Sequence, residues 1–73
     1  MGDISVKSEI TGTVWKIETE VGQQVAEDDV VMILESMKME IPVMAPQNGK
    51  LKSITVNEGD SVSEGQEVAV MED

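Results

Sequence analysis

One lysine of this chain lies between two methionines. Lys38 is flanked by Met37 and Met39, near the middle of a 73-residue chain that has only five basic residues. Lysine normally occurs among other charges on a solvated face, because its ammonium is costly to desolvate and its stem loses entropy when it is held still. A primary amine on a long stem can, however, be brought close to an activated acyl group. The sequence therefore indicates acylation as the chemistry that Lys38 could undergo.

No second reactive group accompanies this amine. The chain contains neither histidine nor cysteine, so it lacks the usual catalytic base, a thiolate nucleophile and the commonest metal ligands. The residues that are present do not supply a set of nucleophile, base and oxyanion donors. We therefore expect no catalytic residue, no metal site and no enzymatic activity of the chain itself. An acyl group would have to be activated by another protein.

The segments on either side of Lys38 predict a hairpin. Residues 30–34 are continuously apolar and rich in β-branched side chains, and residues 39–45 return as a second apolar run. This length and composition favour strands over helix. Met37 and Lys38 would be the central residues of a type I′ turn, which needs positive φ at both and normally uses Asn-Gly or Asp-Gly. Holding two other residues there costs on the order of 1–3 kcal/mol each, so the surrounding sheet must impose the turn.

The rest of the chain also predicts short strands. Pro42 cannot donate a ladder hydrogen bond, which predicts a sheet edge or a bulge at that residue. A break in alternation between Leu51 and Ile54 predicts a second irregularity. No 3.6-residue apolar stripe runs for three turns, so the chain is predicted to be all-β. We expect a flattened barrel or sandwich of two antiparallel sheets with about four short strands each. The other predicted strands cover residues 3–9, 13–19, 50–56 and 67–71.

The sequence repeats itself at a shift of 37 residues. The matches fall on turn glycines and apolar positions, where backbone geometry and burial dictate the residue type. We interpret the chain as two copies of one unit that pack face to face. With a twofold relation, the termini would meet at one pole and Lys38 would stand at the other. The identical pairs at this shift include Val6 and Val43, Gly12 and Gly49, Ile17 and Ile54, Gly22 and Gly59, Val25 and Val62, Glu27 and Glu64, Val31 and Val68, and Glu35 and Glu72.

Length and charge restrict the function classes. Residues 1–73 are enough for a single domain, near the lower size limit for one hydrophobic core. Fifteen acids against five lysines give a net charge of −10, which repels nucleic acid and anionic membranes. No apolar run approaches the roughly 20 residues that span a bilayer, and the first residues do not resemble a signal peptide. We expect a soluble, cytoplasmic monomer.

Residues 35–39, Glu-Ser-Met-Lys-Met, resemble the attachment motif of biotinyl domains, the biotin carboxyl carrier modules of biotin-dependent carboxylases. The resemblance covers essentially the whole chain, because the twofold repeat, the strand count and the central lysine also match the biotinyl/lipoyl domain family. Methionine on both sides of the lysine is typical of biotin acceptors. Family members often have alanine where this chain has Ser36. The halves match without an inserted loop, which is typical of the minimal, stand-alone type of attachment protein.

The resemblance implies a carrier function. Lys38 would be biotinylated by a separate biotin protein ligase, and the domain would carry carboxybiotin between biotin carboxylase and carboxyltransferase subunits. Met37 and Met39 would serve ligase recognition and orientation, since thioethers are adaptable apolar surface. The other residues assigned to the tip are Glu35, Ser36 and Glu40.

Two alternatives remain open from the sequence. In the first, Lys38 carries lipoate and the domain shuttles acyl groups or electrons, although lipoyl domains usually place Asp before the lysine and Ala or Val after it. In the second, the chain is an unmodified interaction domain of the same fold.

The remaining methionines and the tryptophan have simpler interpretations. Met37 and Met39 could be strand residues of the core instead of recognition elements. Trp15, the one aromatic residue, is expected to cap an edge of the core rather than bind a ligand. The methionines predicted to fill the core are Met32, Met44 and Met71.

Overall fold

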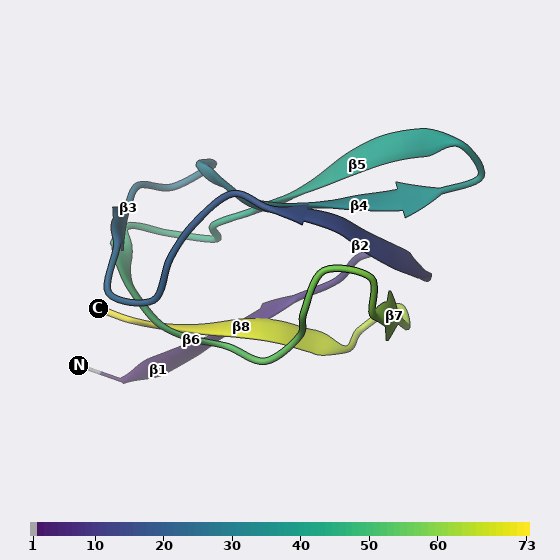
Figure 1. Ribbon diagram of the computed structural model, residues 1–73. Helices are drawn as coiled ribbons and strands as arrows, with labels where there is room; N and C mark the ends of the chain where they lie inside the picture. The colour runs from purple at the N-terminus through teal and green to yellow at the C-terminus, as the bar shows by residue number, and fades with distance from the viewer. Residues whose placement is uncertain (1) are drawn as a thin grey trace.

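The computed structural model describes residues 2–73, which form eight short strands (Figure 1). These residues contain no helix, and so none that could cross a membrane. The all-β prediction is confirmed, and each segment predicted as a strand contains one. The strands are β1 (Asp3–Lys7), β2 (Gly12–Ile17), β3 (Gln24–Val25), β4 (Val30–Ser36), β5 (Met39–Met44), β6 (Gly49–Ile54), β7 (Ser61–Val62) and β8 (Glu67–Glu72).

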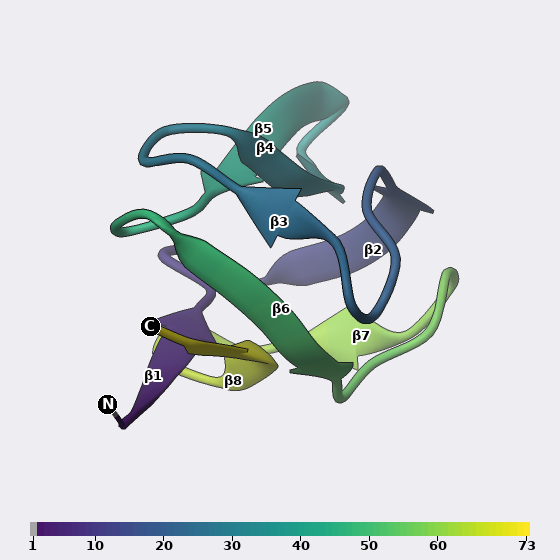
Figure 2. The same cartoon turned by 90° about the vertical axis from the view of Figure 1, so that its left-hand side faces the viewer.

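The strands form two four-stranded antiparallel sheets that face each other (Figures 1 and 2). One has the order β5-β4-β2-β7 and is called the tip sheet below. The other has the order β1-β8-β6-β3 and is called the terminal sheet, because it holds both ends of the chain. Each sheet takes two strands from each half of the sequence, so neither half could form a sheet pair alone. The predicted sandwich is confirmed.

The 37-residue repeat is also a repeat in structure. The shift converts β1, β2, β3 and β4 into β5, β6, β7 and β8, and it converts the order of one sheet into that of the other. Loop hydrogen bonds follow the same rule. The Gly59 N–H donates to the Val14 carbonyl over 2.8 Å, and the equivalent Gly22 N–H donates to the Leu51 carbonyl over 2.7 Å. The two halves therefore share one backbone design.

Buried side chains from both sheets fill the space between them. Met32 and Met71 are fully buried, as predicted. The prediction for Met44 is wrong, because this side chain is 49% exposed. Side chains alternate across a strand, and in β5 the inward position belongs to Val43. The core consists of Val6, Val14, Val25, Val31, Met32, Leu34, Val43, Ala45, Leu51, Val56, Val62, Val68, Ala69 and Met71.

The predicted irregularities lie where the sequence placed them. Pro42 is in β5, the edge strand of the tip sheet, where a missing N–H donor is tolerated. The register of β6 on β8 shifts between Leu51 and Ser53. An equivalent shift occurs in β2 on β4, between Val14 and Lys16. Matching bulges thus bend the same strand in each half.

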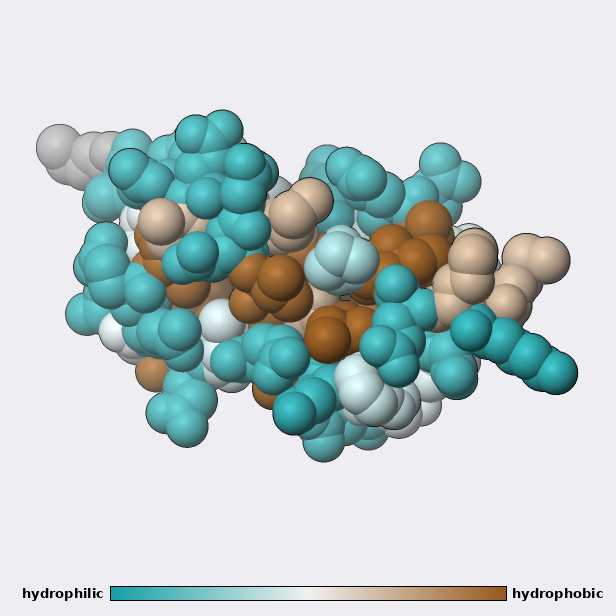
Figure 3. All heavy atoms as spheres, turned by 90° about the horizontal axis from the view of Figure 1, so that it is seen from above, coloured by the Kyte–Doolittle hydropathy of each residue, from teal (hydrophilic) through white to brown (hydrophobic). Residues whose placement is uncertain are grey.

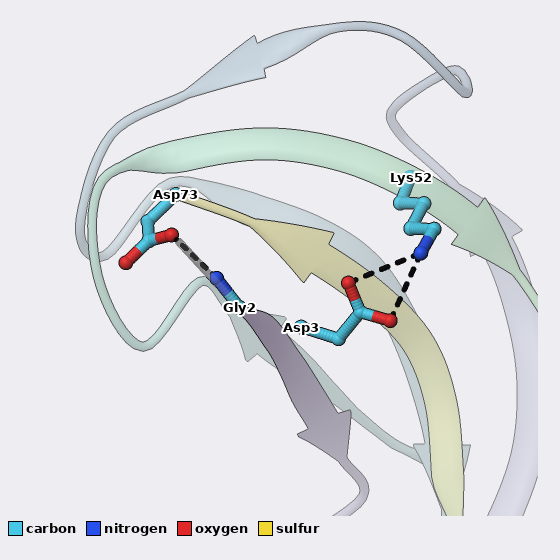
Figure 4. Close-up of polar contacts among 4 residues, drawn as sticks. All are labelled: Gly2, Asp3, Lys52 and Asp73. Carbon is cyan, nitrogen blue, oxygen red and sulfur yellow. Dashed lines mark hydrogen bonds and ion pairs between the residues drawn. The ribbon is translucent and has the colours of Figure 1, made fainter.

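The two chain ends lie together at one pole of the molecule (Figure 4). The Gly2 N–H donates to Asp73 Oδ1 over 2.9 Å, and Lys52 Nζ donates to Asp3 Oδ2 over 2.9 Å. The hydrogen bond and the negative charge of Asp3 raise the pKa of the Lys52 ammonium. The molecule measures 36 × 17 × 17 Å, and the β4–β5 hairpin lies at the opposite end of the long axis (Figure 1). The predicted separation of ends and tip is confirmed.

Candidate functional site

The β4–β5 hairpin closes with two residues, Met37 and Lys38. Ser36 and Met39 are the last paired residues of the two strands, so only these two residues remain in the turn. Their φ angles are 52° and 65°, both in the left-handed region that a type I′ turn requires. The predicted turn is confirmed, although neither residue is the glycine or asparagine that such turns favour.

The sheet imposes this conformation on the turn. The left-handed region costs roughly 1–2 kcal/mol for a residue with a Cβ atom, so the turn needs support from its surroundings. The two strands pair continuously from Glu35 and Glu40 to the turn, and Leu34 anchors β4 in the core. Packing therefore holds the amine of Lys38 at a fixed end of the molecule.

A glycine at the base of the hairpin provides a further constraint. A Cβ atom on Gly12 would lie 2.6 Å from the Glu35 carbonyl oxygen and 3.3 Å from Cβ of Ser36. Only a residue without a side chain lets β2 approach β4 so closely. Sequence reasoning selected Gly12 through its repeat partner Gly49 but did not predict this contact with the hairpin.

The tip residues are open to solvent. Met37 is 89% exposed and Met39 is 58% exposed, so the alternative that places them in the core is wrong. Lys38 is also exposed, and within residues 2–73 its ammonium makes neither an ion pair nor a hydrogen bond. The amine can therefore be approached from outside, between two apolar side chains.

The flanking residues differ in their surroundings. Glu35 and Glu40 are exposed cross-strand partners in adjacent strands, and like charges in this arrangement repel. Ser36 is partly buried, next to the position of Gly12. All six residues assigned to the tip from the sequence thus lie on or beside one hairpin, and the two carboxylates make its base acidic.

The tip is a projection rather than a pocket. A hollow of about 350 Å³ lies between the edge strands β1 and β5, with Val6, Ile41 and Val43 among its lining residues, and it does not include the turn. Within the described part of the chain, no three potential ligand side chains are grouped as a metal site would require. The hairpin can present a group to another protein, but it cannot enclose a substrate.

Trp15, expected at an edge of the core, is a half-exposed residue of β2. It is 49% exposed, whereas its neighbour Val14 is fully buried and faces the core. Because successive side chains of a strand point to opposite faces, the indole lies on the outer side of the tip sheet.

Residues 1–71 match the model of the biotin/lipoyl family, which is described as biotin-requiring enzyme. The chain belongs to this biotin/lipoyl attachment family. It is a biotin carrier domain, and biotin is the cofactor of its family. An exposed amine at the end of a rigid hairpin suits a covalently attached cofactor, so the geometry of the tip fits this family.

Two small proteins and one large enzyme illustrate the relationship. The chain is 42% identical over 62 residues to a biotin/lipoyl attachment protein of Bacillus subtilis, a match that covers 85% of each. It is 39% identical over 66 residues to the biotinylated protein TB7.3 homolog of Mycobacterium leprae, covering 90% of this chain and 93% of that protein. The crystal structure of the urea carboxylase of Kluyveromyces lactis matches 99% of this chain with a TM-score of 0.93 and 39% identity. That match covers only 6% of the enzyme.

Proposed function

We propose that biotin is linked through an amide to Nζ of Lys38, and that residues 1–73 act as a single biotinyl domain. The observation that carries this proposal is the position of the amine. Lys38 stands exposed on a strained two-residue turn, at the end of the molecule opposite the termini, and its ammonium has no partner among residues 2–73. A domain that is tethered through its ends would present this amine as far from the tether as the fold allows.

The chain supplies the nucleophile for this linkage, and a ligase supplies the activated acyl group. The unprotonated amine attacks the acyl carbon, the bond between that carbon and its activating group breaks, and the nitrogen loses one proton. The ammonium charge disappears, so the net charge changes from −10 to about −11. Once bound, biotin supplies a ureido nitrogen that accepts and releases a carboxyl group.

The residues around Lys38 position the arm for this transfer. Met37 and Met39 offer exposed, adaptable surface on both sides of the lysine, which suits contacts with several different partners. In the proposal they are recognised by the biotin protein ligase and guide the arm into the carboxylase active sites. Glu35 and Glu40 add negative charge at the base of the hairpin.

The proposed partners follow from this role. We infer that the domain is itself non-catalytic and works as a monomer with a biotin protein ligase, a biotin carboxylase and a carboxyltransferase. A cytoplasmic location is part of the proposal, and the absence of cysteine agrees with a reducing compartment.

Intact-mass measurement tests the proposal. The chain is treated with a biotin protein ligase, biotin and ATP, beside Lys38→Arg and the control Lys50→Arg, which changes another exposed lysine. We expect one added biotinyl group in the wild type and the control, and none in Lys38→Arg. Absence of the group in folded wild type would contradict the proposal, and a lipoyl group on chain purified from cells would support the lipoyl alternative.

A further inference from the structure

The outer surface of the tip sheet carries an apolar patch, called the tip-sheet face below. It lies on β2, β4 and β5, on the side opposite the buried residues Val14, Leu34 and Val43. Seen from above, hydrophobic side chains gather along the middle of the molecule, with hydrophilic groups at both margins (Figure 3). The tip-sheet face consists of Trp15, Val30, Ile33, Pro42 and Met44.

The fold does not require four of these five residues to be apolar, because the terminal sheet has polar residues at the equivalent positions of the same backbone; only Ile33 has an apolar equivalent, Val70. The 37-residue shift relates Trp15 to Lys52 through equivalent bulges. It also relates the cross-strand pair of Val30 and Met44 to the cross-strand pair of Glu67 and Lys7. An apolar pair on one sheet thus corresponds to a charged pair on the other.

Polar contacts on the terminal sheet complete this contrast. The Ser5 hydroxyl donates to Glu67 Oε2 over 2.8 Å, and Lys52 binds the Asp3 carboxylate at 2.9 Å. The positions equivalent to Ser5 and Lys52 on the tip sheet hold Pro42, whose side chain has no polar atom, and Trp15, which carries no charge. The terminal sheet therefore has an ordinary solvated surface, whereas the tip sheet leaves apolar area exposed to water.

Within the described residues, the large exposed hydrophobic side chains that belong to strands all lie on the tip sheet. On the tip-sheet face, Trp15 and Met44 are each 49% exposed and Val30 is 36% exposed. Within residues 2–73, no strand of the terminal sheet carries a large exposed hydrophobic side chain. Contiguous exposed apolar surface on a small soluble protein is typical of an interaction site.

We propose that the tip-sheet face docks the enzyme that carboxylates the arm on Lys38, through an apolar patch bordered by basic residues on that enzyme. The inference rests on the proposed function for the identity of the partner. It adds a second contact region, separate from the turn, which would hold the domain while the arm reaches the active site.

Charge selects this occupant over a second copy of the chain. The face is bordered by the exposed acids Glu18, Glu35 and Glu40, and the nearby Lys16 lies 3.8 Å from Glu18. Two copies, each with a net charge of −10, would repel each other. An enzyme that fixes bicarbonate binds an anion, so its active-site entrance is expected to be basic and to attract this acidic border.

The test gives the tip-sheet face the residues of its symmetry partner. The triple variant Trp15→Lys, Val30→Glu, Met44→Lys uses side chains that the same backbone already carries in the other half. The control is Glu67→Gln, which changes the net charge by the same +1 on the terminal sheet. All proteins are first biotinylated and checked by intact mass, so a failure of the proposed function would be seen before any docking measurement.

The probe is the biotin carboxylase of the organism that produces the chain, assayed with bicarbonate and ATP while the concentration of biotinylated chain is varied. We expect the triple variant to raise KM for the chain about tenfold or more with little change in kcat, as loss of a central apolar contact would. The control and the carboxylation of free biotin should be unchanged.

Several outcomes would overturn the proposal. One is a KM within about twofold of wild type for a variant that circular dichroism shows to be folded. Another is an equal rise in KM for the triple variant in the reaction of the biotin protein ligase, which would assign the face to the ligase. Self-association of the wild type in sedimentation, abolished in the variant, would assign it to a second copy. If the triple variant does not fold, the single variant Met44→Lys on the edge strand is measured instead, with the same criteria.

Discussion

The two ends of the long axis carry equivalent strand pairs, of which only one is closed by a turn. At one end β4 and β5 are joined by Met37 and Lys38. At the other end the equivalent strands β8 and β1 are paired in the same way, but no turn connects them. There the chain termini meet instead, with the Gly2 N–H bonded to Asp73. The same strand pair therefore serves as a closed, strained tip in one place and as an open attachment point in the other.

Each end also carries a cross-strand pair of acidic residues, and the two pairs have different surroundings. Asp3 and Glu72 are cross-strand partners at the terminal end, and the ion pair of Lys52 with Asp3 offsets one of their two negative charges. At the tip the equivalent acids are Glu35 and Glu40, but the position of Lys52 is taken by a tryptophan. The terminal end thus has partly balanced charge, whereas the tip has two adjacent carboxylates close to the exposed methionines Met37 and Met39.

Moving the lysine by one residue should have the largest effect on the rate of biotinylation at the tip. The double variant Met37→Lys, Lys38→Met keeps the composition and the positive-φ turn but displaces the amine by one Cα step, about 3.8 Å. Misplacement by even about 1 Å can lower a rate by about 100-fold, so we expect at least that loss in biotinylation rate. Labelling time courses with a biotin protein ligase would measure it. A rate near that of wild type would show that the ligase reads only the presence of a lysine on the turn.

The glycines at the two ends should be equivalent for stability but not for function. A Cβ atom at Gly12 would lie 2.6 Å from the Glu35 carbonyl oxygen, and one at Gly49 would lie 2.7 Å from the Glu72 carbonyl oxygen. Gly12→Ala and Gly49→Ala should each lower the free energy of unfolding by about 1–3 kcal/mol in urea denaturation. Only Gly12→Ala should also slow biotinylation, because its clash displaces the hairpin. If both variants slowed biotinylation equally, the idea that β2 positions the hairpin through Gly12 would be wrong.

A smaller effect is expected at two equivalent loop positions. Asp28 has φ of 71° and its repeat partner Gly65 has φ of 84°, and only glycine adopts such angles without cost. Asp28→Gly should therefore stabilise the protein by up to about 1 kcal/mol, whereas Gly65→Asp should destabilise it by about 1 kcal/mol. Thermal unfolding would measure both changes. Effects of the same sign would contradict the structural equivalence of the two loops.

The sequence predicted the parts of the fold that depend on local pattern. The turn at Met37 and Lys38 followed from the distance between two apolar runs, and the bulge near Leu51 followed from a break in alternation. The position of Lys38 opposite the termini followed from the repeat. Each of these features depends on the number of residues between positions in the chain, which can be read directly from the sequence.

The features that were missed depend on which side of a strand faces inward or on contacts between distant strands. Met44 was assigned to the core because β5 has apolar residues on both faces, and only the structure shows that Val43 points inward. The contact of Gly12 with the hairpin arises where the start of β2 lies beside the end of β4, its neighbour in the sheet. The positive φ of Asp28 had one signal, its glycine partner in the other half.

The meeting of the two ends has a consequence for how the domain can be built into other proteins. Because Gly2 and Asp73 are hydrogen-bonded neighbours, both connections to a host chain would leave from a single point. Such a unit could be spliced into a surface loop of a larger enzyme without stretching the host backbone, and a hinge at that point would let the entire module pivot. With a long dimension of 36 Å, a modest change of angle at the hinge would become a wide arc at the hairpin.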